Sequence, residues 1–285
     1  MSEIISIKQL TKTYPNFTLN KINLDIPNGT VVGLIGENGA GKTTLIKSIL
    51  NITKFDSGSI SIFGNDLVLY EKIIKNDIGV VLDDAFFADT LKIKDIIKIV
   101  KHLYKNWNQI KFDNYLTQFN LPKDQVIKTF SKGMKKKLEI AVALSHDPKL
   151  LILDEPTSGL DPIARNEILE ILRAFIQDEQ HAILISSHIT TDLEHIADYI
   201  SFINNGNLIF TKTQDELLGD YGIIKCNEIE FKQLAKNEYI AYRKNTYNIE
   251  ILTNVRPLIS KKYPRLLIER PTIEDIMMFY IKGDK

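Results

Sequence analysis

The chain has 285 residues, which is enough for one large domain or for a large and a small one. Its 36 Lys and Arg balance 36 Asp and Glu, so global charge gives no argument for a nucleic-acid-binding protein. A single cysteine excludes an intrachain disulfide. The first residues lack a signal-peptide pattern, and no apolar run reaches the ~18 residues of a membrane span. We therefore expect a cytoplasmic protein, for which any membrane role requires a partner.

Two segments near the N-terminus, residues 4–10 and 19–26, alternate apolar and polar side chains. This alternation predicts two strands that each have one wet face. Tyr14 lies between them. From this residue alone two roles are open: its ring packs within the fold, or it stacks on a bound adenine ring.

The next feature is a glycine-rich loop between a short apolar run, residues 31–35, and a segment of helical spacing, residues 44–50. The loop reads Gly36-Glu37-Asn38-Gly39-Ala40-Gly41-Lys42-Thr43-Thr44. This matches the G-x-x-x-x-G-K-[ST] pattern, in which the glycines let backbone N–H groups point at an anion. Lys42 is expected to reach the β- and γ-phosphates of a nucleotide, and Thr43 to offer a hydroxyl to Mg²⁺. The alternative is a glycine-rich turn without a ligand.

Residues 60–64 and 78–82 predict two further strands, and the second ends at Asp83. From about residue 85 to residue 145 the apolar spacing becomes helical, which indicates a helical insert between sheet strands. Within this insert Ser131 and Gly133 come at the start of a helical run. They form either a plain N-cap or an anion-binding cap.

Two apolar runs end in polar side chains. Residues 150–153 precede Asp154 and Glu155. Asp154, at the end of a buried strand, can hold Mg²⁺, and Glu155, facing the other way, can polarise a water molecule. Residues 182–187 precede His188, at the sheet edge where ligands gather in open α/β sheets.

The chain is predicted to form two domains, residues 1–218 and 219–285. In the second we expect strands at residues 229–231 and 247–252 and a helix at residues 257–262. The predicted fold class is α/β: a P-loop NTPase core with an antiparallel β subdomain and a helical insert, plus a small α+β C-terminal domain.

The ordered set of motifs resembles the ATP-binding subunit of ABC transporters, over about residues 3–215. The matching motifs are the aromatic Tyr14, the phosphate loop at residues 36–44, the signature Phe130-Ser131-Lys132-Gly133-Met134, the Walker-B strand ending at Asp154-Glu155, the D-loop Ser158-Gly159-Leu160-Asp161 and the switch histidine His188. A weaker similarity, over residues 270–276, is to the tails of subunits of drug, peptide and bacteriocin exporters.

Two departures from the family pattern stand out. The family usually has glutamine where this chain has Asp83, and glycine and glutamine where it has Lys132 and Met134. We hypothesise that Asp83 still reaches the metal, because a carboxylate is a hard oxygen ligand. The alternative is that Asp83 only ends a strand and faces solvent.

The resemblance implies ATP and Mg²⁺ as cofactors. It implies catalytic roles for Lys42, Glu155 and His188, and metal contacts from Thr43, Asp83 and Asp154. It implies nucleotide contacts from Tyr14, Asn38, Gly39, Ala40, Gly41, Lys42, Thr43, Thr44, Ser131, Gly133 and Asp161.

The resemblance also implies partners. Two such subunits, identical or different, meet head to tail with ATP between the phosphate loop of one and the Ser131–Gly133 cap of the other. A separate transmembrane permease subunit holds the pair at the inner face of the membrane and carries the cargo, and export is expected. No nucleic-acid partner is expected.

The main alternative is a soluble ABC ATPase of translation or DNA repair. Translation-type members usually carry two ATPase units in one chain, whereas this chain has one phosphate loop. Repair-type members carry a long coiled-coil insert, and no heptad run occurs here. A P-loop kinase is a more distant alternative, against which the Ser131 cap and His188 both argue.

Overall fold

The computed structural model describes residues 3–83 and 87–284. The chain forms two compact units, Met1–Ile209 and Phe210–Lys285. The predicted helical insert begins at residues 85 and 86, which lie outside the described residues.

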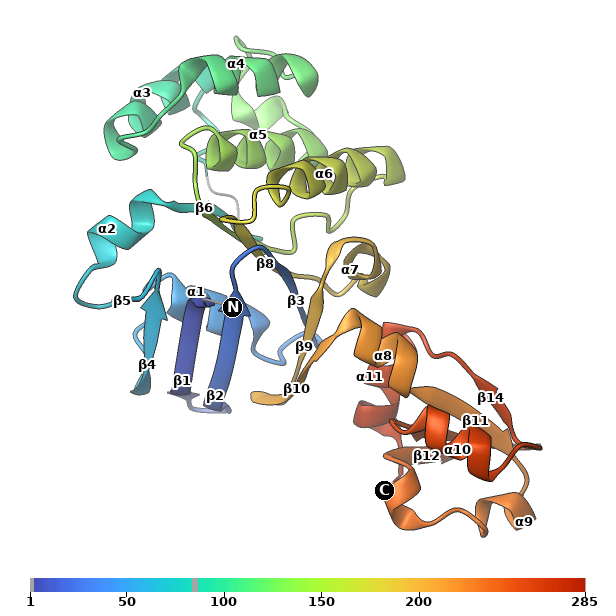
Figure 1. The fold of residues 1–285 in the computed structure, drawn as a ribbon. Helices are drawn as coiled ribbons and strands as arrows, with labels where there is room; N and C mark the ends of the chain where they lie inside the picture. The colour runs from blue at the N-terminus through green and yellow to red at the C-terminus, as the bar shows by residue number, and fades with distance from the viewer. Residues whose placement is uncertain (1–2, 84–86, 285) are drawn as a thin grey trace. The chain divides into compact units, whose positions relative to one another are not determined.

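Two sheets form the framework of the first unit (Figure 1). The central sheet has the strand order β10-β9-β3-β8-β7-β6, and the other has the order β2-β1-β4-β5. The strands are β1 Glu3–Tyr14, β2 Phe17–Pro27, β3 Val31–Ile35, β4 Ser57–Ile62, β5 Asn65–Asp66, β6 Ile78–Val81, β7 Leu150–Asp154, β8 Ala182–Ser186, β9 Tyr199–Asn204 and β10 Asn207–Thr213. The pairs of the second sheet are antiparallel, in agreement with the antiparallel β subdomain of the predicted fold class.

The centre of the first sheet is parallel and buried. Strands β6, β7, β8, β3 and β9 pair in parallel. Every residue of β3, β7 and β8 is buried, which explains their continuous apolar sequences, since helices cover both faces of a parallel sheet. The polar residues that follow these strands therefore meet at one edge.

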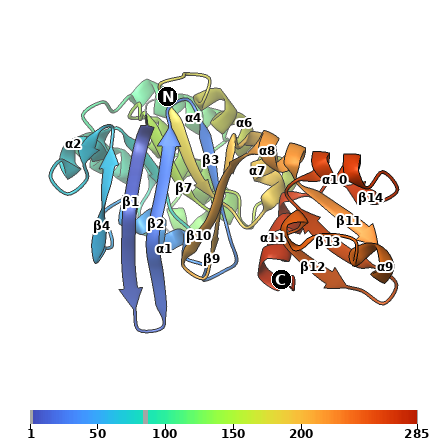
Figure 2. The same cartoon turned by 60° about the horizontal axis from the view of Figure 1, so that its bottom comes forward.

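Helix α1 (Lys42–Ile49) links the two sheets (Figure 2). Its side chains Leu45, Ile46 and Ile49 belong to one core with Ile5 of β1 and Ile152 of β7. Burial of this helix face holds α1 in place. The position of the glycine-rich loop is then set, because the loop joins the end of β3 to the start of α1.

The predicted helical insert is a group of helices that lie together in Figure 1. It comprises α3 Ile93–Leu103, α4 Gln109–Gln118, the short 3₁₀ helix Ile127–Thr129 and α5 Lys132–Leu144. Helix α5 packs on β6 and on α4. The remaining helices of this unit are α2 Glu71–Asn76, α6 Pro162–Phe175 and α7 Thr190–Ile196.

The second unit is a small α+β fold. Its antiparallel sheet has the order β12-β13-β11-β14. Its elements are α8 Gln214–Asp220, β11 Gly222–Cys226, α9 Glu228–Phe231, the 3₁₀ helix Lys236–Glu238, β12 Ala241–Lys244, β13 Ile249–Thr253, α10 Arg256–Lys262, β14 Leu267–Glu269 and α11 Ile273–Lys282. Together with the first unit this confirms the predicted fold class.

The second unit begins earlier than the boundary predicted after residue 218. The ring of Phe210 lies 5.5 Å from the ring of Tyr280 and 6.5 Å from that of Tyr221. Because aromatic rings bury large apolar areas, the contacts in this cluster make the end of β10 and the whole of α8 part of the second unit.

One predicted strand is wrong. Residues 229–231 form helix α9, because Asn227 caps it. The Asn227 side chain accepts hydrogen bonds from the N–H groups of Ile229 and Glu230, and the Glu230 carboxylate accepts one from the N–H of Asn227. This capping box outweighs the β propensity of the two apolar residues.

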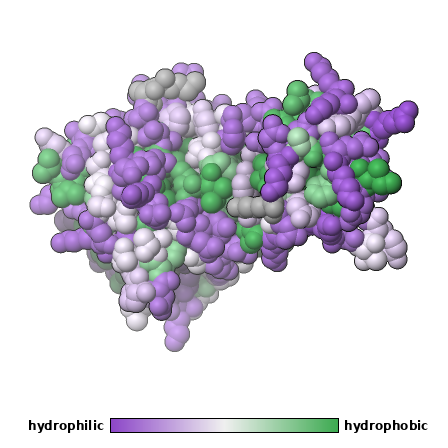
Figure 3. Space-filling view, turned by 90° about the horizontal axis from the view of Figure 1, so that it is seen from below, coloured by the Kyte–Doolittle hydropathy of each residue, from purple (hydrophilic) through white to green (hydrophobic). Residues whose placement is uncertain are grey.

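Hydrophilic side chains cover most of the face shown in Figure 3, with hydrophobic ones in small groups between them. Among the described residues, no helix is long and apolar enough to cross a membrane.

Candidate functional site

The glycine-rich loop is held in shape by close backbone approaches. A Cβ atom on Gly36 would lie 2.3 Å from the carbonyl oxygen of Ile203, so only glycine fits there. Gly41 has φ of 116° and is followed at once by α1, and a Cβ on it would meet the ring of Phe17 at 2.8 Å. The loop therefore opens a helix N-terminus with its first N–H groups available to an anion.

Lys42 lies inside this loop and is 6% exposed. Its Nζ donates hydrogen bonds to the carbonyl oxygens of Gly36, at 2.7 Å, and Glu37, at 3.3 Å. It also lies 3.9 Å from Oε1 of Glu155. Burial lowers the pKa of Lys42, while the carboxylates of Glu155 and Asp154 act against that shift. The loop thus places a cation where phosphate charge would lie.

A serine that the sequence analysis gave no role orients Asp154. Asp154 Oδ2 accepts a hydrogen bond from the Thr43 hydroxyl at 2.8 Å, and its Oδ1 accepts one from the Ser186 hydroxyl. Ser186 lies opposite Asp154 because β7 and β8 pair in parallel in that register. The signal in the sequence was a serine that ends an otherwise apolar strand.

Thr43 and Asp154 bring two hard oxygen donors together at the first turn of α1. Within the described residues there is no group of three or more metal-ligating side chains of the His, Cys, Asp and Glu types. Two such donors would suit a hard cation such as Mg²⁺, which proteins commonly bind with one or two carboxylates while substrate phosphates and water complete the shell.

Glu155 and His188 are in direct contact. His188 Nδ1 lies 2.6 Å from Glu155 Oε2, and the backbone N–H of His188 donates to the same oxygen at 3.3 Å. Because a carboxylate only accepts, Nδ1 carries the proton and Nε2 is the free ring nitrogen. Glu155 has φ of 51°, and such conformations in non-glycine residues gather at functional sites.

The other predicted residues of the phosphate loop lie around Lys42. Asn38 and Gly39 are exposed and Ala40 is buried, and the Thr44 carbonyl accepts from the Ser48 hydroxyl at 2.8 Å. Direct contacts within one chain thus link a set of five predicted residues: Lys42, Thr43, Asp154, Glu155 and His188.

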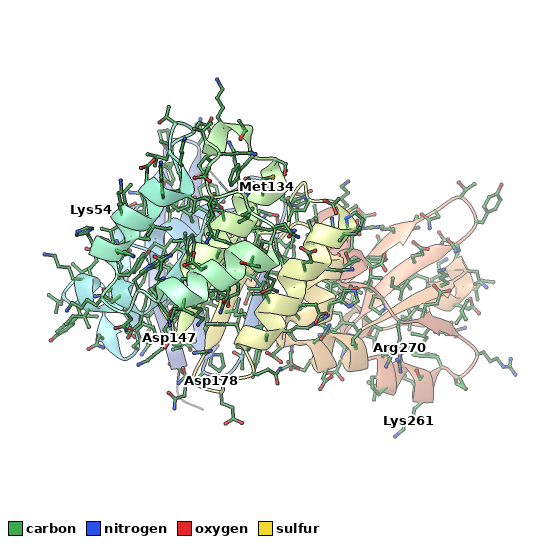
Figure 4. All side chains as sticks on the ribbon, turned by 90° about the horizontal axis from the view of Figure 1, so that it is seen from above. Lys54, Met134, Asp147, Asp178, Lys261 and Arg270 are labelled. Atoms are coloured by element: carbon green, nitrogen blue, oxygen red, sulfur yellow. The ribbon has the colours of Figure 1, made fainter. Side chains whose placement is uncertain are left out.

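The predicted signature and D-loop residues are not part of that linked set. Ser131 is the N-cap of α5, and its hydroxyl accepts from the N–H of Met134 at 3.2 Å (Met134 is labelled in Figure 4). Asp161 is the N-cap of α6, accepting from Ile163 and Ala164 at 3.0 Å each. The bond from Ala164 is the largest contribution to the lowered pKa of Asp161. Gly133 lies near Leu160, so the start of α5 and the D-loop are neighbours.

Tyr14 ends β1 and is 40% exposed. Its ring lies 6.5 Å from that of Phe17, and the Lys12 ammonium is 5.5 Å from its centroid. Because Phe17 also approaches Gly41, the aromatic pair lies beside the phosphate loop. Phe17 received no role from the sequence.

Asp83 is exposed and makes no hydrogen bond or ion pair with any described residue, so the structure leaves both roles of this side chain open.

A glycine loop at the end of a buried strand, a lysine inside it, a Thr–Asp pair and an adjacent Glu–His pair define a P-loop nucleotide hydrolase. Comparison with known proteins narrows this class. The family profile described as ABC transporter matches residues 19–158. The lantibiotic transport ATP-binding protein SrtF of Streptococcus pyogenes is 39% identical over 215 residues, which cover 74% of this chain and 92% of that protein. The chain belongs to the ABC transporter family.

Two further similarities agree with this assignment. The bacitracin transport ATP-binding protein BcrA of Enterococcus faecalis is 35% identical over 212 residues, covering 73% of this chain and 69% of that protein. A solved structure described as the ATP-binding subunit of an ABC transporter is 28% identical with a TM-score of 0.69, covering 75% and 91% of the two chains. The chain is thus an ATP-binding subunit with ATPase activity that powers transport, and the alternatives in translation and repair are not favoured.

Proposed function

We propose that this subunit powers the export of a peptide antibiotic through a separate membrane subunit. The observation that carries the proposal is the similarity, at 39% and 35% identity, to ATP-binding proteins named for the transport of a lantibiotic and of bacitracin. Both names refer to peptide antibiotics. The membrane subunit is part of the proposal because none of the described helices is suited to span a membrane.

The contacts within one chain support specific roles. Lys42 binds the β- and γ-phosphates of ATP, exchanging its carbonyl partners in the loop for charged oxygens. Thr43 and Asp154, with Asp83 as a further candidate, hold Mg²⁺, which when bound would neutralise phosphate charge. Glu155 accepts a proton from the attacking water, and His188 orients Glu155 through Nδ1. A contact of His188 with the γ-phosphate would run through Nε2 and would require a proton on that nitrogen, because phosphate oxygens only accept.

The residues outside the linked set support a head-to-tail pair of subunits. Ser131 and Asp161 cap helices α5 and α6 and make no described contact with Lys42 or Glu155. A second subunit supplies the Ser131–Gly133 turn, or the corresponding turn if that subunit is a different chain, to the ATP held by the first. Helix α5 is 13 residues long, so its N-terminus carries a substantial partial positive charge for the γ-phosphate. Tyr14 stacks on the adenine ring.

The experiment has two stages. The tagged full chain is expressed in a Gram-positive host, and complexes are purified from detergent-solubilised membranes. Recovery of an integral membrane protein supports the proposal, whereas recovery of ribosomes or DNA contradicts it. Inside-out membrane vesicles containing the complex are then given ATP and fluorescent bacitracin. ATP-dependent accumulation in the vesicles, abolished by Lys42→Ala, indicates export, while ATP hydrolysis without peptide movement excludes bacitracin as the cargo.

A further inference from the structure

A buried carboxylate close to the ATPase site has no role in the mechanism above. Asp192, in the first turn of α7, is only 2% exposed. Its Oδ2 accepts a hydrogen bond from the Thr157 hydroxyl at 2.6 Å, and its Oδ1 lies 3.7 Å from Nη1 of Arg165. Thr157 is fully buried. A buried carboxylate requires partners of this kind, because burying an unpaired charge is costly.

The Thr157–Asp192 bond joins the same two segments as the Glu155–His188 contact. Thr157 follows Glu155 by two residues, and Asp192 follows His188 by four. The two contacts have the same length, 2.6 Å, and one is buried while the other faces the phosphate site. Together they close a ring of contacts between the loop after β7 and the segment after β8. The buried contact therefore restricts how far the exposed one can open.

The exposed contact needs such a restraint. The side chain of His188 is 47% exposed, so water competes for its ring nitrogens. Glu155 has the positive φ that the surrounding structure must hold in place. Helix α7 packs closely on β3: a Cβ on Gly33 would lie 3.0 Å from a methyl group of Leu193. Asp192 is thus anchored to the sheet and can hold Thr157 at a constant position.

We propose that Asp192, acting through Thr157, is a positioning residue that keeps Glu155 and His188 in register for ATP hydrolysis. The inference rests on the catalytic role proposed for Glu155. The Arg165 guanidinium, 3.7 Å from Oδ1 of Asp192, gives the buried carboxylate a second partner beside the Thr157 hydroxyl, so that Oδ2 stays directed at Thr157. A purely structural Asp192 would instead stabilise the first turn of α7 without affecting turnover in the folded protein.

The test separates positioning from stability. Thr157→Val keeps the side-chain volume and removes the hydroxyl, and Thr157→Ser restores it. We expect Thr157→Val to lower kcat by about 10- to 100-fold, the effect of misplacing a catalytic group by around 1 Å, with KM for ATP changed less than about twofold. Thr157→Ser is expected to recover most of the lost kcat. Activity is measured below the unfolding temperature of each variant.

Thr253→Val is the matched control. Thr253 is also a fully buried threonine with a hydroxyl hydrogen bond, to the carbonyl of Glu238 at 2.7 Å in the second unit. It should lower thermal stability to a similar extent and leave kcat unchanged. Asp192→Glu provides a second test that retains the charge and moves the carboxylate by one methylene. We expect it to lower kcat as well.

The outcomes for the two proposals differ. If Glu155→Gln abolishes hydrolysis while Thr157→Val and Asp192→Glu keep wild-type kcat, the positioning role is refuted and the catalytic assignment stands. If Glu155→Gln hydrolyses ATP at the wild-type rate, the proposed catalytic role itself is refuted. Additive losses in Thr157→Val and Asp192→Ala, in place of one shared loss in the double variant, would also contradict action through a common hydrogen bond.

Discussion

Replacement of Glu155 by glutamine is the most direct test of the ATPase site. The amide is nearly isosteric, and its oxygen can still accept the hydrogen bond from His188 Nδ1, which is 2.6 Å long in the native protein. The geometry is therefore largely kept, and the main loss is the ability to accept a proton. Lys42 loses one carboxylate at 3.9 Å but keeps Asp154 and its two carbonyl partners.

The expected loss of kcat is therefore the loss of a proton acceptor alone. Loss of a positioned general base lowers kcat by about 10²- to 10⁴-fold. At about 1.4 kcal/mol for each factor of ten, this is a loss of roughly 3–5.5 kcal/mol of transition-state stabilisation. Affinity for ATP should stay the same or increase, because a negative charge close to the phosphates has been removed.

Phosphate release at saturating ATP and Mg²⁺ measures kcat, and size exclusion with ATP measures dimerisation. We expect slow hydrolysis together with an ATP-dependent shift to a dimer. Glu238→Gln is the control, because Glu238 is a buried carboxylate of the second unit that is paired with Lys262 at 2.6 Å. The same chemical change there should affect stability only. A Glu155→Gln kcat within tenfold of wild type would refute the assignment of Glu155 as the base.

Three further predictions follow from the site and its surroundings. Lys42→Ala should weaken ATP binding by about 10- to 100-fold, the value of a charged hydrogen bond, and unchanged binding by calorimetry would contradict the phosphate-loop assignment. Asp83→Ala should raise the Mg²⁺ concentration for half-maximal ATPase activity, and an unchanged Mg²⁺ titration would exclude Asp83 from the metal site. His146 is buried between the carbonyls of Ile78 and Val142, and burial lowers its pKa below 6.5. The unfolded chain then binds the extra proton, so stability should fall as pH drops below about 6.5, and His146→Gln should reduce this fall in urea unfolding.

Much of the linked site was predictable because local sequence determines it. A phosphate loop must lie between its strand and helix, and buried parallel strands must bring their carboxyl ends to one edge. Lys42, Thr43, Asp154 and His188 follow from these two rules. Ser186 and Phe17 do not, because their roles depend on strand register and on the packing of a hairpin tip against Gly41. Such contacts join residues far apart in sequence, where spacing carries no information.

The second unit also contains features that local sequence patterns did not predict correctly. Its strand and helix expected at residues 247–252 and 257–262 have clear local signals, and they are found at residues 249–253 and 256–262. Residues 229–231 were assigned to a strand on their apolar character, although the Asn227–Glu230 capping box was present in the sequence. The start of the unit at Phe210 depends on aromatic contacts with Tyr221 and Tyr280, the latter 70 residues further along the chain, and no local pattern reveals it.

In the proposed head-to-tail pair, the loop that follows β7 connects the catalytic glutamate to the surface that meets the second subunit. Glu155 lies at one end of this loop and faces the phosphate site, while Asp161 at the other end caps α6 next to the Ser131–Gly133 turn. Thr157 lies between them and is fixed to Asp192. Contact of a second subunit with the Asp161 end therefore acts on a loop whose middle is held in place. Because this fixed point is only two residues from Glu155, the proposed contact at the Asp161 end should leave Glu155 in place, and a Thr157→Val variant that loses activity but still dimerises in ATP would agree with this.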